Sequence, residues 1–205
     1  MTSTSLPPSY FEALYAADPD PWRFATSAYE RDKYAATLAA LGERRFDAGL
    51  EVGCSIGVLT RQLAERCGTL LAVDVAEAAL DQARLRCADL PGVRFQRLQA
   101  PREWPPASAG RFGLIVLSEV VYYLAPADVD ALAARVRASL GPGGCALLVH
   151  WLGPTNYPLS GDAAAERFVG AAGLAPVLQQ RRPEYRLDLL QAAGPASAAA
   201  HPGRS

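Results

Sequence analysis

The clearest candidate for ligand chemistry is a short loop, residues 51–57 (EVGCSIG), between an apolar run and a helical pattern. Gly53 and Gly57 allow the backbone to turn tightly and to approach a ligand closely. The first N–H groups of the following helix are free to bind that ligand. The G-x-x-x-G spacing, with Ser55 between the glycines, differs from the G-x-G-x-x-G of nicotinamide-binding loops. Glu51 would repel a pyrophosphate, so the loop suits a ligand with a cationic, zwitterionic end.

Further polar residues follow the later apolar runs. Asp74 ends the second run, where a carboxylate can accept hydrogen bonds from both ribose hydroxyls of an adenosine. Ser118 and Glu119 end the fourth run, on the edge at which open α/β sheets bind ligands. Glu119 either lines the junction between cofactor and acceptor, which we favour, or is a solvated strand end. His150 ends the fifth run and is either a general base or a structural histidine.

Aromatic residues near these strand ends are candidates for an acceptor pocket. One of Tyr122 and Tyr123 is expected to wall the pocket while the other packs in the core. Trp151 opens a long Gly/Pro-rich loop of the kind that determines specificity. Asp162, at the end of that loop, is favoured as a helix N-cap. Residues 27–41 form an amphipathic pattern whose packing stripe is Tyr34, Leu38 and Leu41.

These residues require a framework of alternating strands and helices. Apolar runs predict strands at 48–54, 69–75, 93–99, 112–120 and 145–151. Helical patterns predict helices at 27–41, 57–66, 76–90, 126–140 and 162–172. Residues 174–180 and 185–192 lie too close together for a parallel crossover and must pair antiparallel. The sequence therefore predicts an α/β fold: a Rossmann-like, mostly parallel seven-stranded sheet with helices on both faces and a C-terminal antiparallel hairpin.

Length and composition limit the class of protein further. The chain has 205 residues and a net charge of -1, which fits one domain and excludes a strongly basic nucleic-acid binder. Residues 1–9 are predicted to be a disordered leader, 10–192 a single domain, and 193–205 a disordered tail. The four cysteines form no CxxC pair and the histidines are few, so no metal site is expected. With no signal peptide and no apolar run of about 20 residues, we expect a cytoplasmic protein that does not bind membranes.

Four motifs in order give the chain a family resemblance. LEVGCSIG, VDV around Asp74, FGLIVLSEVVYYL and LGPGG resemble those of the class I S-adenosylmethionine-dependent methyltransferases. DPDPWRF together with SEVVYYL resembles the NodS-like branch, named for a nodulation enzyme that N-methylates a deacetylated glucosamine on a chitooligosaccharide. The resemblance implies the strand order 3-2-1-4-5-7-6, S-adenosylmethionine as the cofactor, and a helical lid within residues 10–46. It also implies that Trp22, Arg23, Tyr29 and Lys33 face the ligands, where the amphipathic pattern alone would have them pack.

The resemblance also implies roles for individual residues. Cofactor contacts are expected from Glu51, Gly53, Cys54, Ser55, Gly57, Asp74, Val75, Gln99, Ala100, Ser118 and Glu119. Acceptor contacts are expected from Trp22, Tyr29, Tyr122, Tyr123, His150 and Trp151. Glu119 and His150 are the candidate catalytic residues. Two positions depart from the family: Gly113 and Ala100 stand where acids are common, so adenine recognition would depend on Gln99, backbone groups or stacking.

The most specific hypothesis is methyl transfer to a small-molecule amine, with an amino sugar as one option. An O-methyltransferase and a non-catalytic cofactor-binding module are the alternatives. Methyltransferases that act on base amines resemble one another in an (N/D/S)PP(Y/F/W) motif after the fourth strand, where residues 118–121 read SEVV. We therefore expect no nucleic-acid partner.

Overall fold

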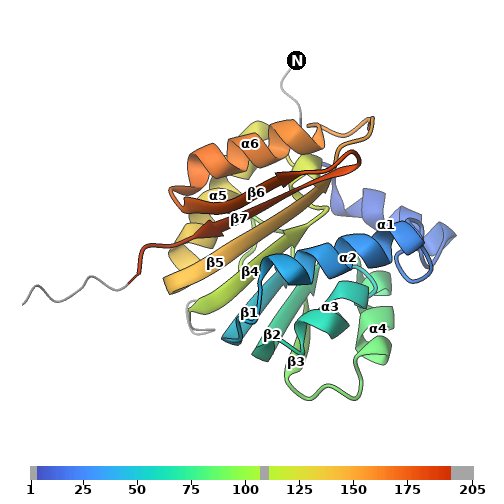
Figure 1. Ribbon diagram of the computed structural model, residues 1–205. Helices are drawn as coiled ribbons and strands as arrows, with labels where there is room; N and C mark the ends of the chain where they lie inside the picture. Colours follow the sequence, from blue (N-terminus) through green and yellow to red (C-terminus); the bar gives the residue numbers. More distant parts are fainter. Residues whose placement is uncertain (1–3, 107–110, 195–205) are drawn as a thin grey trace, which may run out of the picture.

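The sheet has the order that the sequence predicts. The computed structural model describes residues 4–106 and 111–194. Their seven strands form one sheet in the order β3-β2-β1-β4-β5-β7-β6 (Figure 1). Neighbouring strands are parallel except at β5–β7 and β7–β6, which are antiparallel. The predicted fold class, with its C-terminal hairpin, is confirmed.

The strand boundaries differ from the prediction by small amounts. The first four strands end one or two residues early; β1, for example, ends at Val52 because the backbone turns at Gly53, whose φ is 80°. The fifth strand begins at Leu140 rather than at residue 145, because Leu140 pairs with Phe112. The strands are β1 (Phe46–Val52), β2 (Cys67–Asp74), β3 (Val93–Arg97), β4 (Phe112–Ser118), β5 (Leu140–Trp151), β6 (Ala175–Arg181) and β7 (Tyr185–Gln191).

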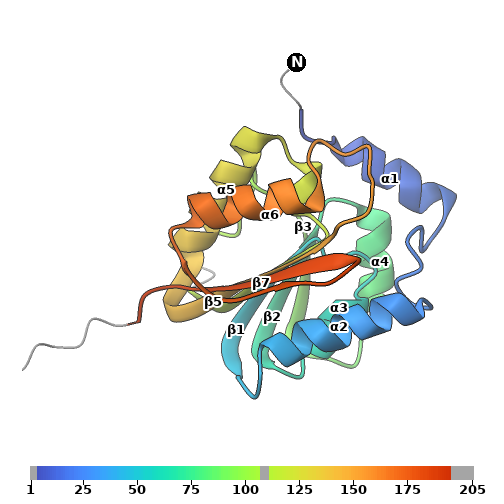
Figure 2. The same cartoon turned by 45° about the horizontal axis from the view of Figure 1, so that its top comes forward.

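Helices cover both faces of this sheet. They are α1 (Pro8–Ala17), α2 (Ala28–Ala40), α3 (Val58–Leu63), α4 (Glu77–Arg86), η2 (Val121–Tyr123, a 3-10 turn), α5 (Pro126–Ser139) and α6 (Gly161–Ala172). Figure 2 shows α5 and α6 over one face and α2 and α3 over the other. Successive residues of a strand point to opposite faces of the sheet, so the core has two parts. Ile115 packs in the cluster that contains Phe168 of α6, and Val116 packs in the cluster that contains Leu63 of α3.

The N-terminal segment is ordered over more of its length than predicted. Residues 4–9, expected to belong to a disordered leader, are anchored: Leu6 N–H donates to Tyr123 O at 2.9 Å, and Ser5 Oγ accepts from Ala125 N at 2.8 Å. The leader prediction is wrong there because apolar and hydroxyl side chains give the segment buried partners. Residues 1–3 and 195–205 of the predicted disordered ends lie outside the described residues.

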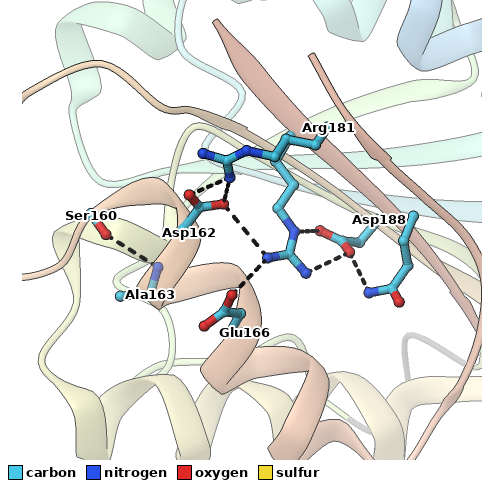
Figure 3. Close-up of polar contacts among 8 residues, drawn as sticks. Ser160, Asp162, Ala163, Glu166, Arg181 and Asp188 are labelled. Carbon is cyan, nitrogen blue, oxygen red and sulfur yellow. Dashed lines mark hydrogen bonds and ion pairs between the residues drawn. The ribbon is translucent and has the colours of Figure 1, made fainter. Parts of the chain in front are cut away.

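The start of α6 corrects the predicted helix cap. Ser160, not Asp162, is the N-cap, because its hydroxyl accepts from Ala163 N at 3.2 Å (Figure 3). Asp162 lies in the first turn and pairs with Arg181 of the hairpin. On the same hairpin, Asp188 is fully buried and accepts from Arg186 Nε at 2.8 Å. The Arg181–Asp162 pair thus links the hairpin to α6, while the Arg186–Asp188 pair lies within the hairpin.

One glycine is required by close packing. Gly57, the N-cap of α3, has φ 78°, and a Cβ there would lie 2.9 Å from Ala83 Cβ of α4. Gly57 therefore allows α3 and α4 to approach each other. Among the described residues, no helix has both the length and the apolar character needed to cross a membrane.

Candidate functional site

A cavity lies at the carboxyl ends of the parallel strands β1, β2 and β4, where each strand continues into a loop. Of the predicted site residues, those that line it are Trp22, Gly53, Ser55, Asp74, Val75, Gln99, Ala100, Ser118, Glu119 and Tyr123. A second, smaller cavity is lined by Glu51 and Cys54 and shares Gly53, Ser55, Ser118 and Glu119 with the first. The glycine loop and the end of β4 therefore form the boundary between the two cavities.

Asp74 is held at the end of β2 by two hydrogen bonds, and its carboxylate can accept more. Its Oδ2 accepts from Ser55 N at 2.8 Å, and its Oδ1 accepts from Ala76 N at 2.9 Å. Burial raises the pKa of the carboxyl, and the backbone hydrogen bonds oppose that rise. Since a carboxylate oxygen can accept two hydrogen bonds, each oxygen keeps one site with no partner among the described residues. Asp74 can thus receive a pair of hydroxyl groups from the cavity.

Glu51 is a buried acid with an unsatisfied oxygen. Its side chain is 1% exposed, and Oε2 has no hydrogen-bond partner in the part of the chain that the structure describes. Burial raises its pKa to about 8. An unpaired buried carboxyl is costly unless a ligand supplies a donor or a cation. Its place on the smaller cavity suits the ammonium of an amino-acid group.

Glu119 is the most constrained residue of the site. Its φ of 56° is unusual for a residue with a side chain, and its N–H donates to Val149 O at 2.8 Å. Its Oε2 accepts from Tyr122 Oη at 2.5 Å and from Trp151 N at 2.9 Å. Its Oε1 accepts from Lys33 Nζ at 2.6 Å. Such over-determined backbone geometry is typical of functional sites.

His150 is not placed to act as a base, which corrects the prediction. It is fully buried, it lines neither cavity, and its Nε2 accepts from Val121 N at 3.1 Å. Burial lowers its pKa to about 4, so the imidazole is neutral at physiological pH. Through this hydrogen bond the ring ties β5 to η2.

The two tyrosines of η2 both pack in the core cluster, but only one of them also lines a cavity. Tyr123 lines the larger cavity, while Tyr122 packs in the core with its hydroxyl on Glu119. Trp151 and Tyr29, both predicted acceptor contacts, line neither cavity. Instead their rings pack edge to face, with centroids 5.5 Å apart. The expected acceptor contacts of Tyr29, Tyr122 and Trp151 are therefore not formed by the cavity walls. Gly57, a predicted cofactor contact, also lies outside both cavities, and its role is the close packing described above.

The missed helix α1 supplies much of the cavity wall. Tyr15 Oη is 2.5 Å from Ser55 Oγ, and Phe11 packs edge to face on Tyr123 at 4.9 Å. Within residues 10–46, where a lid is predicted, α1 and the later residues Trp22 and Phe24 line the larger cavity, whereas no residue of α2 does. The pattern of Phe11, Leu14 and Tyr15, with prolines before it, could have indicated this helix. Further lining residues, not predicted from the sequence, are Ser5, Leu6, Phe11, Tyr15, Phe24, Val52, Leu98, Pro101, Arg102, Val120, Leu124 and Asp128.

Comparisons with known proteins show the family of the chain. The model of the family described as Nodulation protein S (NodS) matches residues 12–140. Nodulation protein S of Bradyrhizobium diazoefficiens is 35% identical over 164 residues, which cover 78% of this chain and 71% of that relative. The protein of the same name from Sinorhizobium fredii is 30% identical over 163 residues, covering 78% and 69%.

Solved structures give the same picture. A candidate methyltransferase from Pseudomonas syringae is 36% identical with a TM-score of 0.71, over 81% of this chain and 100% of that one. The N-methyltransferase NodS from Bradyrhizobium japonicum WM9, in complex with S-adenosyl-L-homocysteine, is 23% identical with a TM-score of 0.74, over 89% and 96%. At that identity the second likeness shows the fold.

Proposed function

Because the chain belongs to the NodS family and is an S-adenosylmethionine-dependent methyltransferase, we propose that it methylates the nitrogen of a small-molecule amine. Amino sugars are the first acceptor class to test, given the resemblance to the NodS-like branch. The observation that carries the proposal is the charge of the larger cavity: Asp74, Glu119 and Asp128 line it, against the single base Arg102. An acidic cavity suits a sulfonium cofactor and a basic acceptor.

The residues present fit that cofactor. When bound, S-adenosylmethionine supplies a methyl group already activated by a positive sulfur. The two free acceptor sites on Asp74 would take the ribose hydroxyls, and the buried Oε2 of Glu51 would face the ammonium. Gly53 lets the loop pack closely on the segment after β4, since a Cβ there would lie 3.2 Å from Val120 Cβ. Gln99 and Ala100 are the proposed adenine contacts.

The chain's own part in the transfer is placement rather than acid chemistry. Glu119 would accept a hydrogen bond from the acceptor N–H and so turn the nitrogen lone pair toward the methyl group. Trp22, Phe24 and Tyr15 would exclude water from the cavity. The amine must be neutral to attack, so the rate should rise with pH up to the pKa of the acceptor.

A paired acceptor assay tests the reaction. With S-(trideuteromethyl)-adenosylmethionine, we expect glucosamine to gain a labelled methyl on nitrogen. N-acetylglucosamine, which differs only in its blocked amine, should react at least about 100-fold more slowly in kcat/KM, because it has no basic nitrogen. Mass spectrometry and NMR locate the methyl. Labelling of a hydroxyl oxygen in both sugars would contradict N-methylation.

The assignment of Glu51 predicts proton release on binding. At pH 7 a carboxyl with a pKa of about 8 is mostly protonated, and a cation beside it favours the ionised form. Binding of S-adenosylmethionine should therefore release close to one proton at pH 7, on the order of 0.9, and fewer above pH 8. The binding enthalpy in phosphate and Tris buffers gives this number. The E51Q variant should release none.

A truncated ligand is the control for that measurement. 5′-Methylthioadenosine keeps the adenosine but lacks the amino-acid end, so its binding should release no proton from Glu51. Equal release from both ligands would assign the proton to another group.

A further inference from the structure

Lys33 is the only lysine of the chain, and it is buried in an ion-pair cluster behind the cavities. Its side chain is 2% exposed, and Nζ donates to Glu30 Oε1 at 2.9 Å and to Glu119 Oε1 at 2.6 Å. The two carboxylates come from different elements, since Glu30 and Lys33 lie on α2 while Glu119 follows β4. Lys33 itself lines neither cavity, whereas Glu119 lines both.

Stability alone does not account for such a cluster. Desolvating a cation and two carboxylates offsets most of their mutual attraction, and apolar side chains of similar volume are often equally stable. The cluster holds one residue, Glu119, in a conformation with positive φ at the boundary of the cavities. A fixed carboxylate at the boundary of the cavities can bind a substrate, and without such a role its desolvation only costs free energy.

We propose that Lys33 is a positioning residue for methyl transfer, which keeps the Glu119 carboxylate ionised and oriented at the boundary between the two cavities. The proposal rests on the proposed function, because it assumes that Glu119 faces the acceptor there. Tyr122 and the Trp151 N–H already fill the two acceptor sites of Oε2. Lys33 fills one site of Oε1, so one acceptor site remains for a substrate N–H.

Lys33 is the cation that keeps Glu119 ionised. Burial would raise the pKa of Glu119, but the Lys33 charge and the hydrogen bonds outweigh it and leave that pKa lowered. His150, the nearby group on β5, is neutral at physiological pH because burial lowers its pKa to about 4. The titratable groups that face Glu119 are Tyr29, Glu30, Lys33 and Tyr34 on α2, Tyr122 and Tyr123 on η2, His150 on β5, and, around the shared cavities, Glu51 and Asp74.

The test compares the pH profile of K33M with that of a background variant lacking two other buried carboxyls, so that only the difference between the two profiles is read. E51Q removes the group whose pKa is about 8, and E30Q removes the second carboxylate that the loss of Lys33 would leave unpaired. In this double background, K33M should leave Glu119 protonated near neutrality. Because the carboxylate returns as pH rises, we expect kcat to fall about 100-fold at pH 6 but only about 10-fold at pH 9. An equal loss at both pH values would overturn the proposal.

Two controls separate charge from structure. K33R keeps the cation and should restore most of the activity and the original pH profile. Arg84 offers a matched surface pair, since it also donates to two carboxylates, Glu77 at 2.7 Å and Asp81 at 2.8 Å, but lies away from the cavities. R84M should therefore leave both kcat and the pH profile unchanged.

A measurement on the unmodified sequence keeps the proposal testable if a variant does not fold. Lysine labelled with 13C at the ε-carbon gives a single side-chain NMR signal, because Lys33 is the only lysine. S-Adenosyl-L-homocysteine should shift this signal through Glu119. Binding measured by calorimetry without any shift of the signal would overturn the coupling. Absence of binding itself would instead contradict the proposed function.

Discussion

Replacing Asp74 by alanine should lower the affinity for S-adenosylmethionine at least about 100-fold. The substitution removes the two free acceptor sites proposed to bind the ribose hydroxyls, and hydrogen bonds to a charged group contribute about 1.5–3 kcal/mol each. It also releases the Ser55 and Ala76 N–H groups, so the glycine loop loses its anchor. Both effects act in the same direction. Isothermal titration calorimetry with S-adenosylmethionine measures the change.

Asp47 provides the matched control for this variant. It is an exposed aspartate on β1, at the end of the sheet opposite the cavities. D47A changes the same side chain in the same sheet and should leave the affinity within about twofold. If D74A binds S-adenosylmethionine as tightly as D47A does, the assignment of the ribose site is wrong.

Replacing Gly57 by alanine should destabilise the fold by about 3 kcal/mol. The backbone at φ 78° disfavours any side chain, at a cost of about 1 kcal/mol or more. The added Cβ would also lie 2.9 Å from Ala83 Cβ and 3.0 Å from Ala83 Cα, so α3 and α4 must separate. Overpacking of this kind typically costs about 1–3 kcal/mol. Urea unfolding followed by circular dichroism gives the free energy of unfolding.

Two other glycines separate the contributions. Gly143 has φ 72° with no atom within 4 Å of an added Cβ, so G143A should show the backbone cost alone, about 1 kcal/mol. Gly170, within α6, also has open space around an added Cβ, and G170A should raise stability by about 0.5–1 kcal/mol. A G57A variant no less stable than G143A would show that the α3–α4 contact is not tight.

The strand ends could be predicted because their chemistry is local. Asp74 and Glu119 each follow an apolar run, and parallel strands bring their carboxyl ends to one edge of the sheet. Both residues line the larger cavity in the structure. The linear pattern fixes which residues meet there, because the register of a buried strand allows few alternatives.

The errors arise where the outcome depends on packing between distant segments. His150 lies one residue before the end of β5, yet its side chain is fully buried, and no local signal separates a buried strand end from an open one. The burial of Lys33 depends on Glu119, which lies 86 residues away in the chain. The N-terminal segment looked disordered because its composition is polar, whereas Leu6 and Phe11 find apolar partners around Tyr123.

Because α1 covers the cavity, it can also limit the rate of cofactor exchange. Each turnover must admit one cofactor molecule and discharge its spent form, and α1 is fastened before its first residue and at its middle. Ser5 and Leu6 bind the segment around η2 and α5, while Glu12 pairs with Arg97 Nη2 at 2.6 Å. Segments held in this way open on microsecond to millisecond timescales. A cofactor that enters past α1 can therefore turn over no faster than residues 4–17 open, however fast the methyl group itself moves.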